Sequence, residues 1–164
     1  MKSLIDARIW KLQDDIDTDI IIPTQYLALK TVDNMKKYAF SPLRSELAGL
    51  INPGDIIVAG KNFGCGSSRE QAPEILVALG VGCIIAKSFA RIFYRNALNN
   101  GLLLIENNEL PDICSEGDRI TVDFGKNQII YKNERFNLPS IPEELFKMVE
   151  AGGLVPYIRK QNGI

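Results

Sequence analysis

Three short apolar runs, separated by two stretches of helical periodicity, dominate the middle of the chain. The runs occupy Ile56–Ala59, Cys83–Ala86 and 102–105. Around 68–79 and 89–99, apolar residues recur at spacings of three and four. Short continuous apolar runs are typical of buried strands, and the intervening spacing is typical of amphipathic helices. Strands that alternate with helices predict a parallel α/β core with right-handed crossovers.

The flanking segments predict a smaller second set of elements. Partial alternation over 5–12 indicates a strand, and 118–124 with 128–131 indicate two antiparallel strands joined by a tight turn. Ser140 followed by Glu143 has the spacing of a capping box, which predicts a helix ending at the glycine pair after 151. We expect loop and short helix over 25–51, and an irregular end after the glycine pair.

Length and charge narrow the class of protein. The chain has 164 residues and a formal net charge of −1. This length suits one domain, 1–164, with a substantial core, and the charge gives no global attraction to nucleic acid or membrane. No apolar run approaches the length of a membrane span, and the N-terminus does not have the pattern of a signal peptide. We therefore expect a cytoplasmic protein with no nucleic-acid or membrane partner.

The chain contains no histidine and three cysteines that are far apart, Cys65, Cys83 and Cys114. Without histidine or a C-x-x-C pair, the sequence predicts no metal site built from this chain alone. Cys83 lies in an apolar run and is expected to be buried and inert. Cys65 precedes an expected helix start, where a thiolate is favoured.

Residues 60–71, GKNFGCGSSREQ, form a glycine-rich loop that follows an apolar run and opens a helix. Free amides and the helix dipole make such a loop a natural anion site, and the fork of Arg69 suits a carboxylate. Ser67 and Glu70 have the spacing of a capping box. A tight turn with a capped helix remains an equal alternative. The loop lacks the Gly-Lys-Ser/Thr ending of a P-loop and the third glycine of a dinucleotide fingerprint.

Two other segments carry charge. Four aspartates fall within residues 14–19. For Asp14 and Asp15 we favour a solvated turn in which the side chains bond their own backbone. Ser88 is placed to cap the helix over 89–99, on which Arg91 and Arg95 share a face. A solvated basic face is the plainer interpretation of that pair.

Three motifs, taken together, resemble a known family. They are D-T-D-x-I-I-P at 17–23, G-K-N-F-G-C-G-S-S-R-E at 60–70 and K-S-F-A-R-I-F-Y-R-N at 87–96. In this order they closely resemble the small subunits of 3-isopropylmalate dehydratase, which are similar to the swivelling domain of aconitases. The resemblance covers about 7–159. It implies a swivelling β/β/α domain whose mixed sheet has a largely parallel core, and an enzyme divided between two chains. The large subunit of such an enzyme carries a [4Fe–4S] cluster, so the resemblance implies no cofactor on this chain.

The resemblance also implies a chemistry: water is removed from a hydroxy-dicarboxylate and added back at the neighbouring carbon, in leucine biosynthesis. The cluster iron acts as a Lewis acid, and Ser67, as an alkoxide, removes the proton. Asp19 and Arg69 complete the implied catalytic set. The implied substrate contacts are Thr18, Gly66, Ser68, Arg69, Ala28, Leu29 and Lys30. A serine can act as a base only where its oxyanion is stabilised, which the amides and Arg69 would provide.

Substrate choice is less well determined. The loop after I-I-P resembles the loop that, in this family, determines which side group of the substrate is accepted. Ala28 and Leu29 suit an isopropyl group, whereas Lys30 suits the additional carboxylate of homoaconitate. We therefore favour isopropylmalate and keep homoaconitase or dual activity as the alternative. A stand-alone carboxylate- or anion-binding module is a second alternative, and the isolated chain could form a homo-oligomer.

Overall fold

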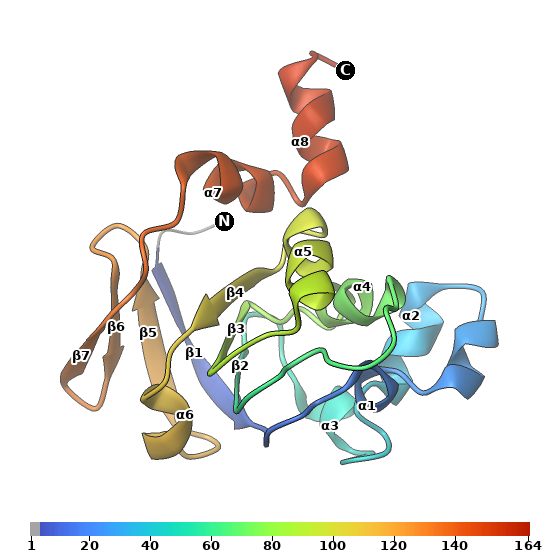
Figure 1. Ribbon diagram of the computed structural model, residues 1–164, viewed down its shortest axis with the longest axis horizontal. Coiled ribbons are helices and arrows are strands. Elements are labelled where there is room, and N and C mark those ends of the chain that lie inside the picture. Colours follow the sequence, from blue (N-terminus) through green and yellow to red (C-terminus); the bar gives the residue numbers. More distant parts are fainter. Residues whose placement is uncertain (1–3) are drawn as a thin grey trace.

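The computed structural model describes residues 4–164, which build one curled seven-stranded sheet with the order β4-β3-β2-β1-β5-β6-β7 (Figure 1). The strands are β1 (Leu4–Lys11), β2 (Ile56–Ala59), β3 (Cys83–Ala86), β4 (Leu103–Glu106), β5 (Arg119–Asp123), β6 (Gln128–Tyr131) and β7 (Glu134–Asn137). The α-helices are α1 (Thr18–Ile21), α2 (Val32–Met35), α3 (Leu47–Leu50), α4 (Gln71–Ala78), α5 (Arg91–Asn99), α6 (Leu110–Ile113), α7 (Glu143–Glu150) and α8 (Leu154–Gln161). Two 3₁₀ helices are η1 (Thr24–Ala28) and η2 (Lys36–Tyr38).

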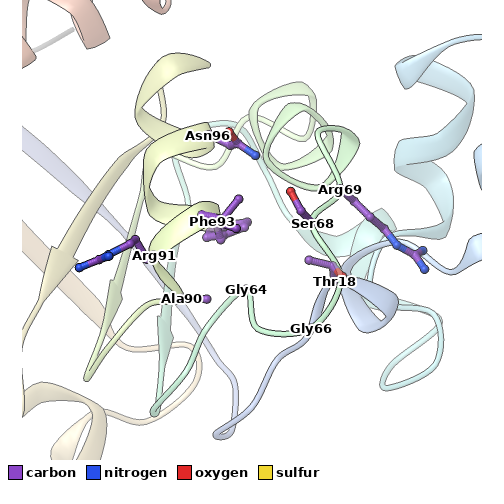
Figure 2. A pocket seen from close by; sticks show the side chains of 10 residues that line it. Thr18, Gly64, Gly66, Ser68, Arg69, Ala90, Arg91, Phe93 and Asn96 are labelled. Carbon is purple, nitrogen blue, oxygen red and sulfur yellow. The ribbon is translucent and has the colours of Figure 1, made fainter.

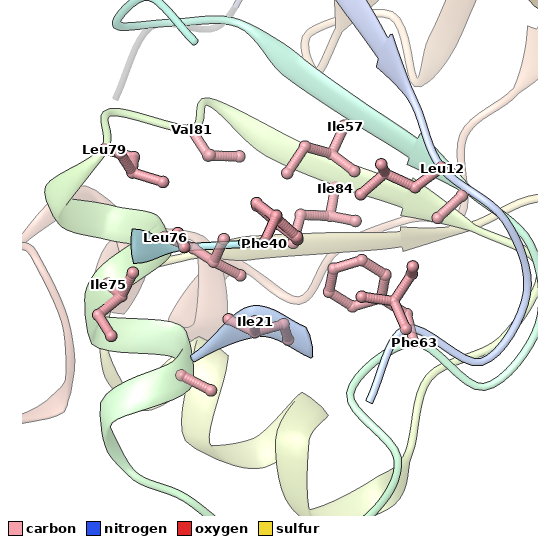
Figure 3. Packing of buried hydrophobic residues seen from close by; sticks show 14 of the residues in the cluster. Leu12, Ile21, Phe40, Ile57, Phe63, Ile75, Leu76, Leu79, Val81 and Ile84 are labelled. Atoms are coloured by element: carbon pink, nitrogen blue, oxygen red, sulfur yellow. The ribbon is translucent and has the colours of Figure 1, made fainter. Parts of the chain in front are cut away.

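The parallel half consists of β1 to β4, and its strands pair in order. Every residue of β2 and β3 is buried. Their side chains alternate between two hydrophobic clusters: Ile57 and Ile84 join the cluster beneath α4, and Ile56 and Ile85 join the cluster beneath α7. Burial on both faces explains why these strands are continuous apolar runs. Figure 3 shows the first cluster, in which Phe40 and residues of α4 pack against the sheet.

The antiparallel half consists of β5 to β7, which extend the sheet from the other edge of β1. Burial alternates along β5 and β6, because only one face of these strands packs against the core. The mixed sheet confirms the predicted fold class, with the parallel pairs confined to β1–β4.

All three predicted helix caps are wrong. In the structure α4 begins at Gln71 after Glu70, α5 begins at Arg91 after Ala90, and α7 begins at Glu143 after Pro142. None of these three starts has a side-chain cap. Ser88 Oγ instead accepts a hydrogen bond from the backbone amide of Asn62, at 2.9 Å. A contact between loops therefore takes the place of a helix cap at this position.

Four elements were not predicted. Two are the short helices α1 and α6. The other two are the strand β7, which has four polar or half-buried residues, and α8, which was expected to be irregular because it follows Gly152 and Gly153. Figure 1 shows α8 standing away from the body of the molecule. Among residues 4–164, no helix has the length and apolar character needed to cross a membrane.

The carboxyl ends of β1, β2 and β3 lie at one edge of the sheet, because the three strands are parallel. The aspartate-rich segment follows β1, the glycine-rich loop follows β2, and the segment before α5 follows β3. Clefts at this edge are the usual ligand sites of parallel α/β sheets.

Candidate functional site

A pocket of about 300 Å³ lies where these three segments meet (Figure 2). Its lining comes from α1, the glycine-rich loop and the start of α5: Thr18, Gly64, Gly66, Ser68, Arg69, Ala90, Arg91, Ile92, Phe93 and Asn96. Four of the predicted site residues therefore line one cavity, namely Thr18, Gly66, Ser68 and Arg69. Arg91, for which a solvated basic face was the plainer interpretation, is exposed but lines the same cavity.

The glycine-rich loop is held against α1 and the residues just before it by three hydrogen bonds. The Thr18 amide donates to the Cys65 carbonyl at 2.9 Å, and the Gly64 amide donates to the Ile16 carbonyl at 2.7 Å. The Thr18 hydroxyl donates to the Ser67 carbonyl at 2.7 Å. Thr18 is only 2% exposed, so this buried hydroxyl is satisfied by the backbone of Ser67. The contact fixes the peptide on which Ser67 is carried.

Two glycines shape the loop for different reasons. Gly64 has φ +84°, and a Cβ there would lie 2.1 Å from Cγ of Phe93. Gly66 has φ +90°, and a Cβ there would meet nothing closer than 3.4 Å. Close packing against α5 therefore requires Gly64, whereas Gly66 is required by its backbone conformation alone.

Arg69 extends away from Phe93 toward the segment after α1, as Figure 2 shows. Its guanidinium forms an ion pair with Asp19 and donates to the Ile22 carbonyl at 2.9 Å and to the Thr24 hydroxyl at 2.8 Å. The side chain of Arg69 is 13% exposed, whereas the side chain of Asp19 is 62% exposed. The fork thus already holds one carboxylate, which lies at the solvent side.

Ser67 and Ser68 are both exposed, and Ser68 belongs to the pocket lining. Ser67 is not among the lining residues, but it lies between two of them, Gly66 and Ser68. Its side chain is therefore accessible from the open side of the molecule beside the pocket.

Asp14 and Asp15 bind the loop rather than their own backbone, so the self-bonded turn predicted for these two residues is wrong, whereas Asp17 caps α1 by accepting from the Ile20 amide at 2.8 Å. Asp14 accepts a hydrogen bond from the Lys61 amide at 2.7 Å, and Asp15 accepts one from the Asn62 side chain at 3.0 Å. Two of the four aspartates therefore bind the beginning of the glycine-rich loop.

The start of α5 contributes pocket residues that the sequence analysis did not assign to a site. Ile92 is one of the apolar residues at helical spacing in 89–99, and this spacing predicts a buried position. In the structure Ile92 is instead 55% exposed and lines the pocket. Asn96 lies four residues later and lines the same cavity. The i, i+4 spacing of these two residues was the available signal, because it places them on one face of the helix.

Comparison with known proteins points to the same family as the three sequence motifs. The aconitase C-terminal domain model matches residues 24–110. The 3-isopropylmalate dehydratase small subunit of Lachnospira eligens is 61% identical over 164 residues, covering 100% of this chain and 99% of that protein. The chain belongs to the small-subunit family of 3-isopropylmalate dehydratases.

More distant members of this family show the same agreement over nearly full length. The isopropylmalate/citramalate isomerase small subunit of Methanocaldococcus jannaschii is 42% identical and covers 98% of this chain and 97% of its own length. A crystal structure of 3-isopropylmalate dehydratase from the same organism superposes with a TM-score of 0.90 at 40% identity, covering 97% of this chain and 95% of that chain.

The loop that was predicted to determine substrate choice lies outside the pocket lining. Ala28 ends η1, and Ala28 and Lys30 are exposed. Leu29 is half-buried and packs against the cluster beneath α4. The structure therefore does not bring these three residues into the same cavity as Ser68 and Arg69.

The cysteines of this family member do not fit an iron–sulfur cluster. The described part of the chain contains no group of three or more Cys, Asp or Glu side chains that could hold a metal ion. Burial raises the pKa of the Cys83 thiol to about 12 and that of Cys114 to about 11. A cluster requires thiolates gathered at one place, and these thiols are separate and resist ionisation.

The structure does not favour a thiolate at Cys65. Burial and the nearby charges of Asp17 and Asp15 raise the pKa of this thiol. The nearest helix downstream, α4, begins only at Gln71 and gives no compensating dipole at Cys65.

Proposed function

We propose that this chain is the small subunit of a two-chain hydro-lyase that interconverts 2-isopropylmalate and 3-isopropylmalate by dehydration and rehydration, in leucine biosynthesis. The observation that carries the proposal is the pocket at the carboxyl edge of the sheet, where motif residues Thr18, Gly66, Ser68 and Arg69 converge. Full-length similarity to named small subunits supports it. The expected cytoplasmic location is part of the same proposal.

In the proposed reaction, Ser67 is the base. Its alkoxide takes the proton from the carbon next to a substrate carboxylate, hydroxide leaves the neighbouring carbon, and water then adds to the double bond in the opposite sense. Serine is a weak acid, so the alkoxide must be fixed and stabilised in the complete site. Thr18 supports this role by holding the Ser67 carbonyl.

Arg69 is proposed to bind a substrate carboxylate, with Ser68 as a neighbouring hydrogen-bond donor. In the described structure the Asp19 carboxylate forms an ion pair with this guanidinium. A substrate carboxylate has the same charge and shape as the Asp19 side chain, so it can replace that group on the fork. Asp19 is then released toward the reacting groups, consistent with its proposed place in the catalytic set.

The partner is proposed to be a large subunit that carries the [4Fe–4S] cluster and covers the open side of this pocket. Gly66, Ser67 and Ser68 are exposed in the single chain, and water there would compete for every charged group of the site. A second chain that covers the loop would exclude that water.

The substrate is proposed to carry a small apolar group. The relative from Methanocaldococcus jannaschii is named for both isopropylmalate and citramalate, which differ only in the size of this group. Apolar pockets discriminate such differences by only about 1–3 kcal/mol, so activity on both is physically reasonable. Homoaconitate, suggested by Lys30, remains the alternative prediction.

The test is anaerobic reconstitution with cluster-bearing large subunits of the same organism, followed by absorbance of the unsaturated intermediate. We expect turnover of isopropylmalate, weaker turnover of citramalate and the least of homocitrate. The absence of turnover from an assembled complex with an intact cluster would contradict the proposal. If the isolated chain then bound dicarboxylates as tightly without a partner as with one, the stand-alone anion-binding module would be favoured.

A further inference from the structure

The Arg69 guanidinium joins the glycine-rich loop to the segment that carries the substrate-choice residues. It donates to the Ile22 carbonyl at 2.9 Å and to the Thr24 hydroxyl at 2.8 Å, one residue to either side of Pro23. Thr24 is also the first residue of η1. One side chain thus holds both the entry to η1 and its first residue.

The segment 24–30 has few other hydrogen bonds. The Tyr26 amide donates to the Pro23 carbonyl at 3.0 Å, and the Leu29 amide donates to the Tyr26 carbonyl at 3.1 Å, so both bonds are local. Within residues 4–164, the bond from Arg69 to Thr24 is the hydrogen bond that ties this segment to a distant part of the chain. Beyond it, Tyr26 stacks on Tyr38 with ring centroids 3.9 Å apart, and Tyr26, Leu27 and Leu29 pack against the core cluster.

We infer that Thr24 is a positioning residue that couples the carboxylate-binding arginine to the substrate-choice loop. This inference rests on the proposed function, which gives Arg69 and Ala28–Lys30 their roles. An incoming carboxylate replaces Asp19 on the fork, because the two groups are alike, while the neutral Thr24 hydroxyl keeps its own bond. The orientation of the guanidinium and the position of the loop 28–30 therefore depend on each other through the Thr24 hydroxyl.

The decisive variant is Thr24→Val, which keeps the branched shape and removes the hydroxyl. In the reconstituted enzyme we expect KM for isopropylmalate to rise about fivefold, the effect of losing an exposed hydrogen bond to a charged group, with a smaller change in kcat. The preference for isopropylmalate over citramalate should narrow, because the loop is less fixed. Thr24→Ser should restore both values, since it keeps the hydroxyl.

Thr121→Val is the matched control, because it makes the same change on β5, far from the pocket. It should leave KM and substrate preference unchanged. A Thr24→Val enzyme with wild-type KM and wild-type preference would overturn the inference.

A second measurement does not depend on turnover. Trypsin cleavage after the exposed Lys30, followed by mass spectrometry of the isolated chain, reports how firmly the loop is held. We expect several-fold faster cleavage in Thr24→Val and no change in Thr121→Val. If the wild-type enzyme turned over nothing with any large subunit, the proposed function would fail, and faster cleavage would still support the coupling. Unchanged cleavage in Thr24→Val would refute it.

Discussion

The parallel and antiparallel halves of the sheet share β1 but differ in how they use their residues. In the parallel half, β2 and β3 are wholly buried, and the segments that follow β1, β2 and β3 carry the polar residues of the pocket. In the antiparallel half, buried and exposed residues alternate along β5, and the connections are short turns. The candidate site therefore belongs to the parallel half, and the antiparallel half contributes buried residues to the hydrophobic core.

This difference indicates why so little of the pocket is made by strands. Strands that are buried on both faces have no side chains left for a ligand, so chemistry is moved into the loops at their carboxyl ends. Those loops are then held by hydrogen bonds between each other, such as Thr18 to Ser67 and Asn62 to Ser88. Changes in the two halves should consequently have different effects.

The largest expected difference concerns two glycines with similar backbone angles. Gly64→Ala should lower the free energy of unfolding by about 3–5 kcal/mol, because its Cβ would lie 2.1 Å from Phe93 Cγ in addition to the cost of positive φ. Gly117→Ala, before β5, has φ +89° and open space, so it should cost only about 1–2 kcal/mol. Urea unfolding of both variants measures the difference. Equal losses would mean that the packing of the loop on α5 is not tight.

The next effect concerns the junction between β1 and β2. Asp55 accepts hydrogen bonds from the Trp10 indole at 2.8 Å, the Asn52 amide at 2.9 Å and Arg8 at 3.1 Å. Burial alone would raise the pKa of Asp55, but these bonds outweigh it and hold the pKa below its ordinary value. Asp55→Ala should lower the free energy of unfolding by about 3 kcal/mol, since it leaves the buried Trp10 indole unpaired and removes the partner of two partly buried donors.

The pH dependence of this contribution has a definite sign. Because the folded pKa of Asp55 is lowered, its stabilisation is complete above the unfolded value of about 3.9 and is lost as the pH falls through the folded pKa. The gap between wild type and Asp55→Ala should therefore be large at neutral pH and shrink in acid. Since Asp55 lies at the opposite edge from the pocket, KM should not change. A gap that stayed constant down to acid pH would contradict this account.

The smallest effect concerns the exposed Lys30. Lys30→Leu should reduce activity on homoaconitate relative to isopropylmalate by about two- to fivefold, the range of an exposed charge interaction. Lys126→Leu, in the turn between β5 and β6, removes a lysine from the antiparallel half and should leave this ratio unchanged. Equal effects of Lys30→Leu on both substrates would show that this position does not discriminate between their side groups.

The sequence predicted strands better than helix starts. Apolar runs located β2 and β3 to the residue, because burial on both faces allows only apolar side chains. The predicted caps at Ser67, Ser88 and Ser140 failed because local spacing does not reveal tertiary competitors: Ser88, for example, binds the Asn62 amide. The short polar strand β7 was missed because its pairing with β6 is made by backbone groups.

For the site, the motifs predicted which loops matter, and the structure places Thr18, Gly66, Ser68 and Arg69 on one cavity. The sequence did not reveal that Asp19 holds Arg69, because an ion pair between residues 50 apart has no local pattern. Nor did it reveal that exposed Ile92 lines the cavity, since an apolar residue at helical spacing was assigned to the core.

The most direct test of the central claim is the turnover of Ser67→Ala in the reconstituted complex, at equal assembly and equal cluster content. Ser140→Ala, an exposed serine before α7, is the matched control. The account predicts a fall in kcat of about 100- to 10,000-fold for Ser67→Ala, the range for loss of a general base, and no change for Ser140→Ala. Turnover by Ser67→Ala within about twofold of wild type would contradict the assignment of Ser67 as the base.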